Sequence, residues 1–146
     1  MKWDCSIYPD KGILKAVAYY DREELSEQHF LLNRDFVIQE IRCDGIKVVP
    51  EINLVKIHGW YMEYCVQRVT VPGNFKDLEI SYTGRLSGNT GVFPYVREQI
   101  TPEFTFIRWE TFPYPFFVRT VKTRYLGNCR SGGKAALPLL SPTAMR

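Results

Sequence analysis

The chain has 146 residues, which is long enough for one domain that buries its own core. It carries 19 Lys and Arg against 16 Asp and Glu, which gives a formal charge of +3. That charge is too small, and the basic residues are too scattered, to predict a nucleic-acid partner. The sequence opens with Met1-Lys2-Trp3-Asp4 rather than a signal-peptide pattern, and no apolar run approaches the ~20 residues that span a bilayer, so we predict a cytoplasmic protein without direct membrane insertion.

Four cysteines lie far apart in the sequence and form no C-x-x-C pair: Cys5, Cys43, Cys65 and Cys129. This spacing does not indicate a zinc site, and nothing else in the chain indicates a disulfide framework. We therefore predict buried free thiols in a reducing compartment.

The first half of the chain reads as a series of short strands. Residues 3–8 and 13–20 are β-prone and flank the turn cluster Pro9-Asp10-Lys11-Gly12. Residues 21–28 are charged without an apolar stripe, which favours a loop or a single helical turn. Further strands are expected at residues 29–32, 36–43, 46–49, 52–58 and 60–71. Asp44-Gly45 lies between two of these strands and predicts a type I′ hairpin turn, which needs positive φ at both positions.

Residues 78–86 show the clearest strand pattern in the chain. Leu78, Ile80 and Tyr82 alternate with polar or charged neighbours. This alternation predicts a sheet with one face in a core and the other in water. A loop is expected at residues 87–91 and another strand at residues 92–97.

An aromatic stretch follows at residues 99–118. It holds eight large apolar side chains: Phe104, Phe106, Ile107, Trp109, Phe112, Tyr114, Phe116 and Phe117. Pro113 and Pro115 cannot donate to a β-ladder, so the strand should end near Thr111 and turn there. Because apolar side chains fall on both faces, we predict a strand that is covered on one side by the sandwich core and on the other by something further on.

These elements predict an all-β fold, an antiparallel β-sandwich of about ten short strands. Residues 1–125 would form the sandwich domain. Residues 126–146 are rich in Gly, Ser and Pro without a period, and they predict a loose, irregular C-terminal tail.

The strand sequences resemble the N-terminal β-domain of the M1 family of zinc aminopeptidases. Residues 29–33, HFLLN, followed by residues 36–38 are similar to that domain's F-x-L-N and l-x-I pair. Residues 41–45 are similar to its v-x-x-d-G turn, and residues 78–84, LEISYTG, to its L-x-I-x-Y-x-G strand. Ile107-Arg108-Trp109 with Tyr114-Pro115 resembles the aromatic corner before the catalytic domain. The resemblance implies a β-sandwich that packs on a catalytic metallopeptidase domain.

The catalytic motifs of that family are missing from this chain. The H-E-x-x-H helix that binds zinc is absent, and the two histidines, His29 and His58, fall on different predicted strands. Met62-Glu63 only superficially echoes the family's G-x-M-E-N motif. We therefore assign no catalytic residue, no metal ligand and no cofactor, and we expect a protein that is not an enzyme.

Three functional hypotheses follow from these observations. The first is a non-catalytic accessory domain that serves as a scaffold or interaction module for a metallopeptidase domain or another protein. The second is an independent carbohydrate- or protein-binding module that uses surface aromatics. The third and weakest is a hydrolase with an unrecognised site, built on a pair such as Cys65 with His58 or on carboxylates such as Glu63, Glu103 and Glu110. The possible interaction surface comprises Trp60, Tyr61, Phe104, Phe106, Trp109 and Tyr114.

Overall fold

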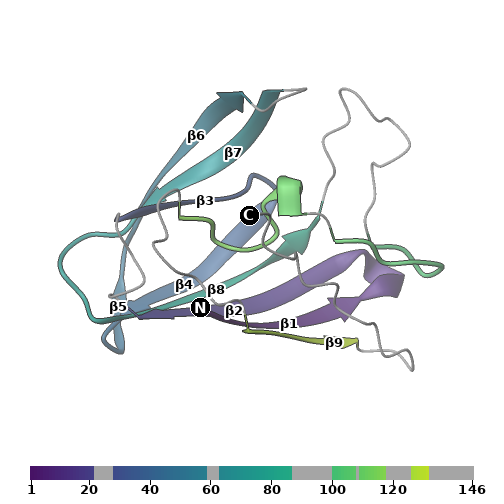
Figure 1. Cartoon of the computed structure of the whole chain (residues 1–146), viewed down its shortest axis with the longest axis horizontal. Coiled ribbons are helices and arrows are strands. Elements are labelled where there is room, and N and C mark those ends of the chain that lie inside the picture. The colour runs from purple at the N-terminus through teal and green to yellow at the C-terminus, as the bar shows by residue number, and fades with distance from the viewer. Residues whose placement is uncertain (22–27, 59–62, 87–99, 108, 118–125, 132–146) are drawn as a thin grey trace, which may run out of the picture.

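Two β-sheets build the molecule, as Figure 1 shows. The computed structural model of the chain describes residues 1–21, 28–58, 63–86, 100–107, 109–117 and 126–131. The elements there are β1 (Lys2–Tyr8), the 3₁₀ turn η1 (Pro9–Lys11), β2 (Ile13–Asp21), β3 (His29–Asn33), β4 (Phe36–Cys43), β5 (Ile46–Val48), β6 (Glu51–His58), β7 (Glu63–Thr70), β8 (Asp77–Arg85), the 3₁₀ turn η4 (Trp109–Thr111) and β9 (Leu126–Ser131). The all-β sandwich that the sequence predicted is confirmed.

The larger sheet has six strands in the order β5-β4-β8-β2-β1-β9. Its first five strands pair in antiparallel fashion, and β9 joins the outer edge of β1 in parallel. β9 lies in the segment 126–146, for which the sequence predicted an irregular tail. That prediction is wrong for residues 126–131, because a strand with little propensity of its own can be held by an existing sheet edge; residues 132–146 lie outside the described residues.

The smaller sheet has the order β3-β7-β6 and is antiparallel throughout. One core lies between the sheets and takes side chains from both. Its fully buried members include Leu14 and Tyr82 from the larger sheet and Phe30, Leu32 and Val69 from the smaller one. The alternation predicted for β8 is confirmed, since the side chains at 78, 80 and 82 are buried while those at 79, 81 and 83 are partly exposed.

The predicted Asp44-Gly45 hairpin is confirmed. Asp44 has a φ of 51° and Gly45 a φ of 79°, and Cys43 pairs with Ile46 across the turn. Positive φ at both central positions is what a two-residue turn of this type requires.

The chain crosses from the smaller sheet to the larger one between β3 and β4, and two buried amide side chains hold this crossing. The Gln67 Nε2 donates to the carbonyl oxygens of Asn33 and Phe36, at 2.9 Å and 2.6 Å. The Asn33 Oδ1 accepts the backbone N–H of Asp35 at 3.0 Å. The turn therefore keeps its backbone groups paired although it lies against the core.

The aromatic stretch is organised differently from the prediction. Residues 100–107 form no strand and show only an isolated bridge between Ile100 and Thr105. The predicted turn is present, as η4 followed by Phe112 with a φ of 54°. The predicted core strand is wrong, because the Ile100–Thr105 bridge reverses the chain within six residues and leaves no length for a ladder.

Cysteine chemistry also departs from the prediction. Cys43 and Cys65 are free thiols, but Cys5 is disulfide-bonded. The prediction of free thiols is therefore wrong for Cys5, because sequence spacing does not reveal which cysteines a sheet register brings together.

The predicted strand at 92–97 and most of the segment 21–28 lie outside the described residues.

Candidate functional site

Three large apolar side chains of the aromatic stretch are exposed. The exposed fractions are 56% for Phe104, 57% for Phe106 and 61% for Trp109. We call these three residues the aromatic surface. The predicted covering of the second face by something outside the sandwich core stays a prediction, because exposure within this chain alone does not test it.

A tight reversal of the backbone presents Phe104. The backbone N–H of Thr101 donates to the Phe104 carbonyl at 2.8 Å, and the Phe104 N–H donates to the Thr101 Oγ1 at 3.2 Å. Ile100, at the base of the reversal, is only 3% exposed. The buried Ile100 thus holds the base of a hydrogen-bonded turn, and the Phe104 side chain on this turn points into solvent.

Residues 111–117 follow Trp109 directly, and we call them the strap. Three of their carbonyl oxygens accept hydrogen bonds from side chains of both sheets. The Asn33 Nδ2 of β3 donates to the Thr111 oxygen at 2.7 Å, and the Tyr82 hydroxyl of β8 donates to the Pro113 oxygen at 2.8 Å. The Tyr20 hydroxyl of β2 donates to the Pro115 oxygen.

Backbone groups of β3 hold the strap as well. Leu31 and Phe116 exchange two backbone hydrogen bonds of 2.8 Å each, and the Asn33 N–H donates to the Phe112 carbonyl at 2.9 Å. Pro113 and Pro115, both buried, have no N–H that would need a partner inside the molecule. These two prolines therefore leave no unpaired backbone N–H of their own in the buried strap.

Tyr82 links the strap to β1. Its hydroxyl accepts the Trp3 Nε1–H at 2.6 Å while donating to Pro113. Burial raises the pKa of Tyr82 far above its ordinary value, so the phenol stays protonated and serves as a structural donor rather than as an acid or base.

The sequence-predicted surface residues separate into three groups. Phe104, Phe106 and Trp109 are exposed. Tyr114 is half-buried and packs edge-on against Trp3, with ring centroids 5.8 Å apart, so it belongs to the strap rather than to the surface. Trp60 and Tyr61 lie outside the described residues.

The structure gives little support to the hydrolase hypothesis. The register of β6 and β7 sets Cys65 opposite Lys56 and His58 opposite Glu63. Cys65 and the hypothesised His58 are thus diagonal neighbours in the ladder. Glu103 is exposed at the tip of the reversal. Within the described ranges, no cluster of three His, Cys, Asp or Glu residues is arranged to hold a metal ion.

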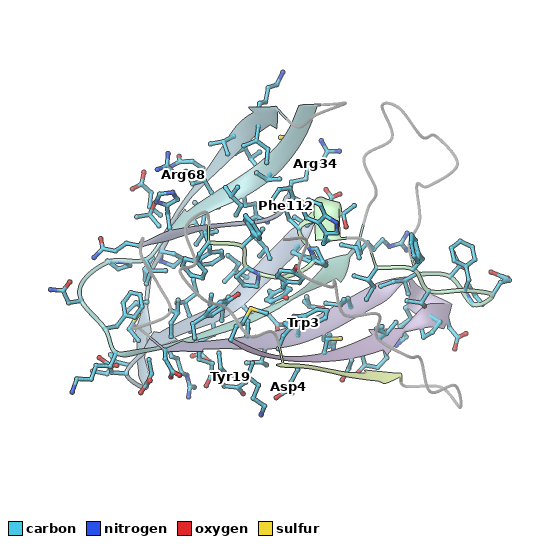
Figure 2. All side chains as sticks on the ribbon, in the orientation of Figure 1. Trp3, Asp4, Tyr19, Arg34, Arg68 and Phe112 are labelled. Carbon is cyan, nitrogen blue, oxygen red and sulfur yellow. The ribbon has the colours of Figure 1, made fainter. Side chains whose placement is uncertain are left out.

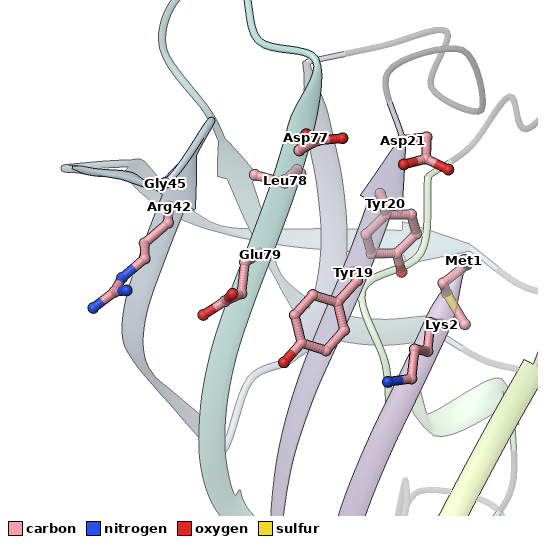
Figure 3. Close-up of a pocket in the computed structure, with 10 residues that line it drawn as sticks. All are labelled: Met1, Lys2, Tyr19, Tyr20, Asp21, Arg42, Gly45, Asp77, Leu78 and Glu79. Atoms are coloured by element: carbon pink, nitrogen blue, oxygen red, sulfur yellow. The ribbon is translucent and has the colours of Figure 1, made fainter.

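A second candidate is a shallow groove of about 440 Å³ across the outer face of the larger sheet, shown in Figure 3. Figure 2 shows Tyr19 and Asp4 on this outer side, whereas Trp3 points between the sheets. One row of register partners crosses the groove: Arg42 faces Glu79, Glu79 faces Tyr19, and Tyr19 faces Lys2. Sequence reasoning missed this row, because alternation identifies the outward positions but not the register that aligns them.

Both basic side chains that line the groove are paired with carboxylates of their own strands. The Lys2 Nζ lies 2.9 Å from the Asp4 carboxylate and 5.4 Å from the Tyr19 ring centroid, and its hydrogen bond to Asp4 raises the pKa of Lys2. The Arg42 guanidinium lies 3.1 Å from the Glu40 carboxylate. Alternating opposite charges are typical of a solvated sheet face, so we do not assign the groove a ligand.

No protein-family model matches the chain, and neither a curated protein nor a solved structure is significantly similar to it. None of the described helical segments has the length and apolar character of a membrane-crossing helix.

Proposed function

We propose that this chain is a non-catalytic β-sandwich that acts as a protein-interaction module and contacts its partner through the aromatic surface. The observation that carries the proposal is the exposure of Phe104, Phe106 and Trp109 by more than half each, in the segment that leads into the strap. Large exposed apolar groups favour association, and aromatic residues contribute strongly to the centres of protein interfaces.

The chemistry of the aromatic surface favours a protein partner over a carbohydrate. Two of its three residues are phenylalanines, whose rings carry no hydrogen-bonding group. Sugar recognition combines ring stacking with polar groups that bind hydroxyls, whereas apolar protein contact requires only complementary apolar area. Carbohydrate binding is therefore the second candidate, to be separated from the first by experiment.

The resemblance to the M1 N-terminal domain gives the proposal its most specific form, in which the partner is a catalytic metallopeptidase domain. An all-β sandwich is compatible with this form but is shared by many unrelated folds. A neighbouring reading frame that encodes H-E-x-x-H would supply the protein to test. Without such a frame, the module would serve a different protein partner.

The test compares two variants of the full chain. The first replaces Phe104, Phe106 and Trp109 by Ser, and the matched control replaces Val37 and Val49, which are 64% and 84% exposed elsewhere. Cross-linking in the native cell identifies the partner, which is then purified and titrated against each chain by calorimetry. We expect the aromatic variant to lose at least tenfold in affinity, since interface aromatics each contribute about 1–2 kcal/mol or more, and the valine variant to retain it.

Two results would contradict this function. One is an unchanged affinity of the aromatic variant, with circular dichroism showing both variants folded. The other is binding on a glycan array that the aromatic variant loses and the valine variant keeps, which would establish the carbohydrate alternative.

A further inference from the structure

The oxidised cysteine in β1 lies on the face of the larger sheet that points into the core. Cys5 is 4% exposed, and its neighbours on that face, Trp3 and Ile7, are 5% and 1% exposed. The other cysteines whose state is described, Cys43 and Cys65, are free thiols. Cys5 is disulfide-bonded, so its partner must be another cysteine.

The backbone register identifies a cysteine at the right position. β9 runs parallel to β1 along its full length, from Lys2 opposite Leu126 to Ile7 opposite Ser131, and Cys5 is opposite Cys129. Neighbouring strands lie about 4.8 Å apart, which falls in the range of about 4.4–6.8 Å between Cα atoms that a disulfide bridges. Residues at one register position also share one face of a sheet.

We propose that Cys5 and Cys129 form a disulfide bond that fastens the C-terminal strand β9 to the N-terminal strand β1. Each thiol loses a proton and the pair loses two electrons as the sulfur–sulfur bond forms. A disulfide oxidant, of the glutathione or protein-disulfide class, accepts the two electrons and the two protons and leaves as two thiols. The bond does not depend on the proposed interaction function.

The burial of Cys5 indicates a persistent, structural disulfide. Its side chain is shielded from solvent, so a reductant must wait until β9 separates from β1. A persistent bond of this kind forms in oxidising compartments and is rare in the cytosol. The cross-link therefore argues against the cytoplasmic location that the sequence predicted.

Peptide mapping tests the pairing directly. The full chain is purified without reductant, its free thiols are alkylated, and it is digested with trypsin. Four cysteine peptides are expected from the sequence, at residues 3–11, 125–130, 43–47 and 57–68. We expect the first two to be joined, WDCSIYPDK with YLGNCR, and the last two to be alkylated. Alkylated Cys5, or Cys5 joined to any other cysteine, would overturn the proposal.

Thermal unfolding of variants provides an independent measurement. Cys129→Ser removes the cross-link without changing the buried Cys5 position, and Cys65→Ser serves as the control because that thiol is free. We expect Cys129→Ser to lower the Tm by roughly 10 °C and to lose all response to a phosphine reductant, while Cys65→Ser still loses Tm when reduced. Equal Tm values for Cys129→Ser and the unreduced parent chain would overturn the proposal.

Discussion

Tyr82 joins two buried hydrogen bonds at a single hydroxyl group. It is fully buried, accepts the Trp3 Nε1–H at 2.6 Å and donates to the Pro113 oxygen at 2.8 Å. Tyr82→Phe would leave a donor and an acceptor without their partner inside the core. We expect it to lower the free energy of unfolding by about 2 kcal/mol, the usual range for an unsatisfied buried group, as measured by urea denaturation.

Tyr19→Phe is the matched control for that change. Tyr19 lies on the outer face of the same sheet and is 38% exposed, so loss of its hydroxyl should alter the free energy of unfolding by no more than about 0.5 kcal/mol. Equal costs for the two substitutions would show that the Trp3–Tyr82–Pro113 contacts contribute nothing beyond burial of the ring.

Asp44 makes the stability of the β4–β5 hairpin depend on pH. Its Oδ1 accepts the backbone N–H groups of Asp77 and Lys76, each at 2.8 Å, and these bonds lower the pKa of Asp44 below its ordinary value. Because the folded-state pKa is the lower one, the carboxylate stabilises the fold above the unfolded-state pKa. That contribution is lost as the pH falls through the folded-state pKa.

Asp44→Asn separates the charge from the hydrogen bonds, since an amide oxygen can accept the same N–H groups and Asn tolerates positive φ. We expect the parent chain to be more stable than the variant at neutral pH and to lose this advantage on acidification. Urea midpoints measured across the acid range check the effect. A constant difference between the two chains at every pH would contradict it.

At the scale of elements, local sequence patterns predicted those features that depend only on residues adjacent in the sequence. The Asp44-Gly45 turn and the alternation of β8 were correct, because turn geometry and a half-buried face depend on adjacent side chains. The strap was missed, because its acceptors are satisfied by Asn33, Tyr82 and Tyr20, which are distant in sequence. The same limit applies to the outer groove and to Cys5, since both depend on which strands become neighbours and in what register.

Gly84 shows how one element constrains another. It sits in β8 opposite Phe36, and a Cβ at this position would lie 2.6 Å from the Asp35 carbonyl oxygen and 3.0 Å from the Phe36 Cα. The crossing from β3 to β4 therefore passes too close to β8 for any side chain. Gly84→Ala should lower the free energy of unfolding by about 3 kcal/mol, because backbone rather than a flexible side chain must move.

Gly73→Ala provides the comparison for this prediction. Gly73 has a φ of 79° but nothing within 4 Å of its would-be Cβ, so the substitution carries only the backbone cost of about 1 kcal/mol. Gly84 has a φ of 158° and carries a backbone cost as well, so urea denaturation of both variants measures what the close approach adds to that cost. A larger loss at Gly73 would contradict the close approach at Gly84.

At the scale of the whole molecule, the strap joins the two sheets into one folding unit. It pairs by backbone with β3 of the smaller sheet and accepts from tyrosines of the larger sheet. Its last described residue continues the link, since the Phe117 ring lies 4.8 Å from the Tyr20 ring and 5.4 Å from the Phe30 ring, centroid to centroid. The aromatic stretch thus divides into an exposed part, the aromatic surface, and a part that completes the core.

Phe117→Ala and Phe104→Ala test this division. Phe117 is 2% exposed and Phe104 is 56% exposed, so we expect the first to lower the free energy of unfolding by about 3–4 kcal/mol and the second by no more than about 0.5 kcal/mol. Hydrogen exchange adds the measurement specific to the strap. Because Phe117 contacts both Tyr20 and Phe30, its loss should speed exchange in β2 and β3 together, whereas faster exchange in one sheet alone would mean that the sheets are joined elsewhere.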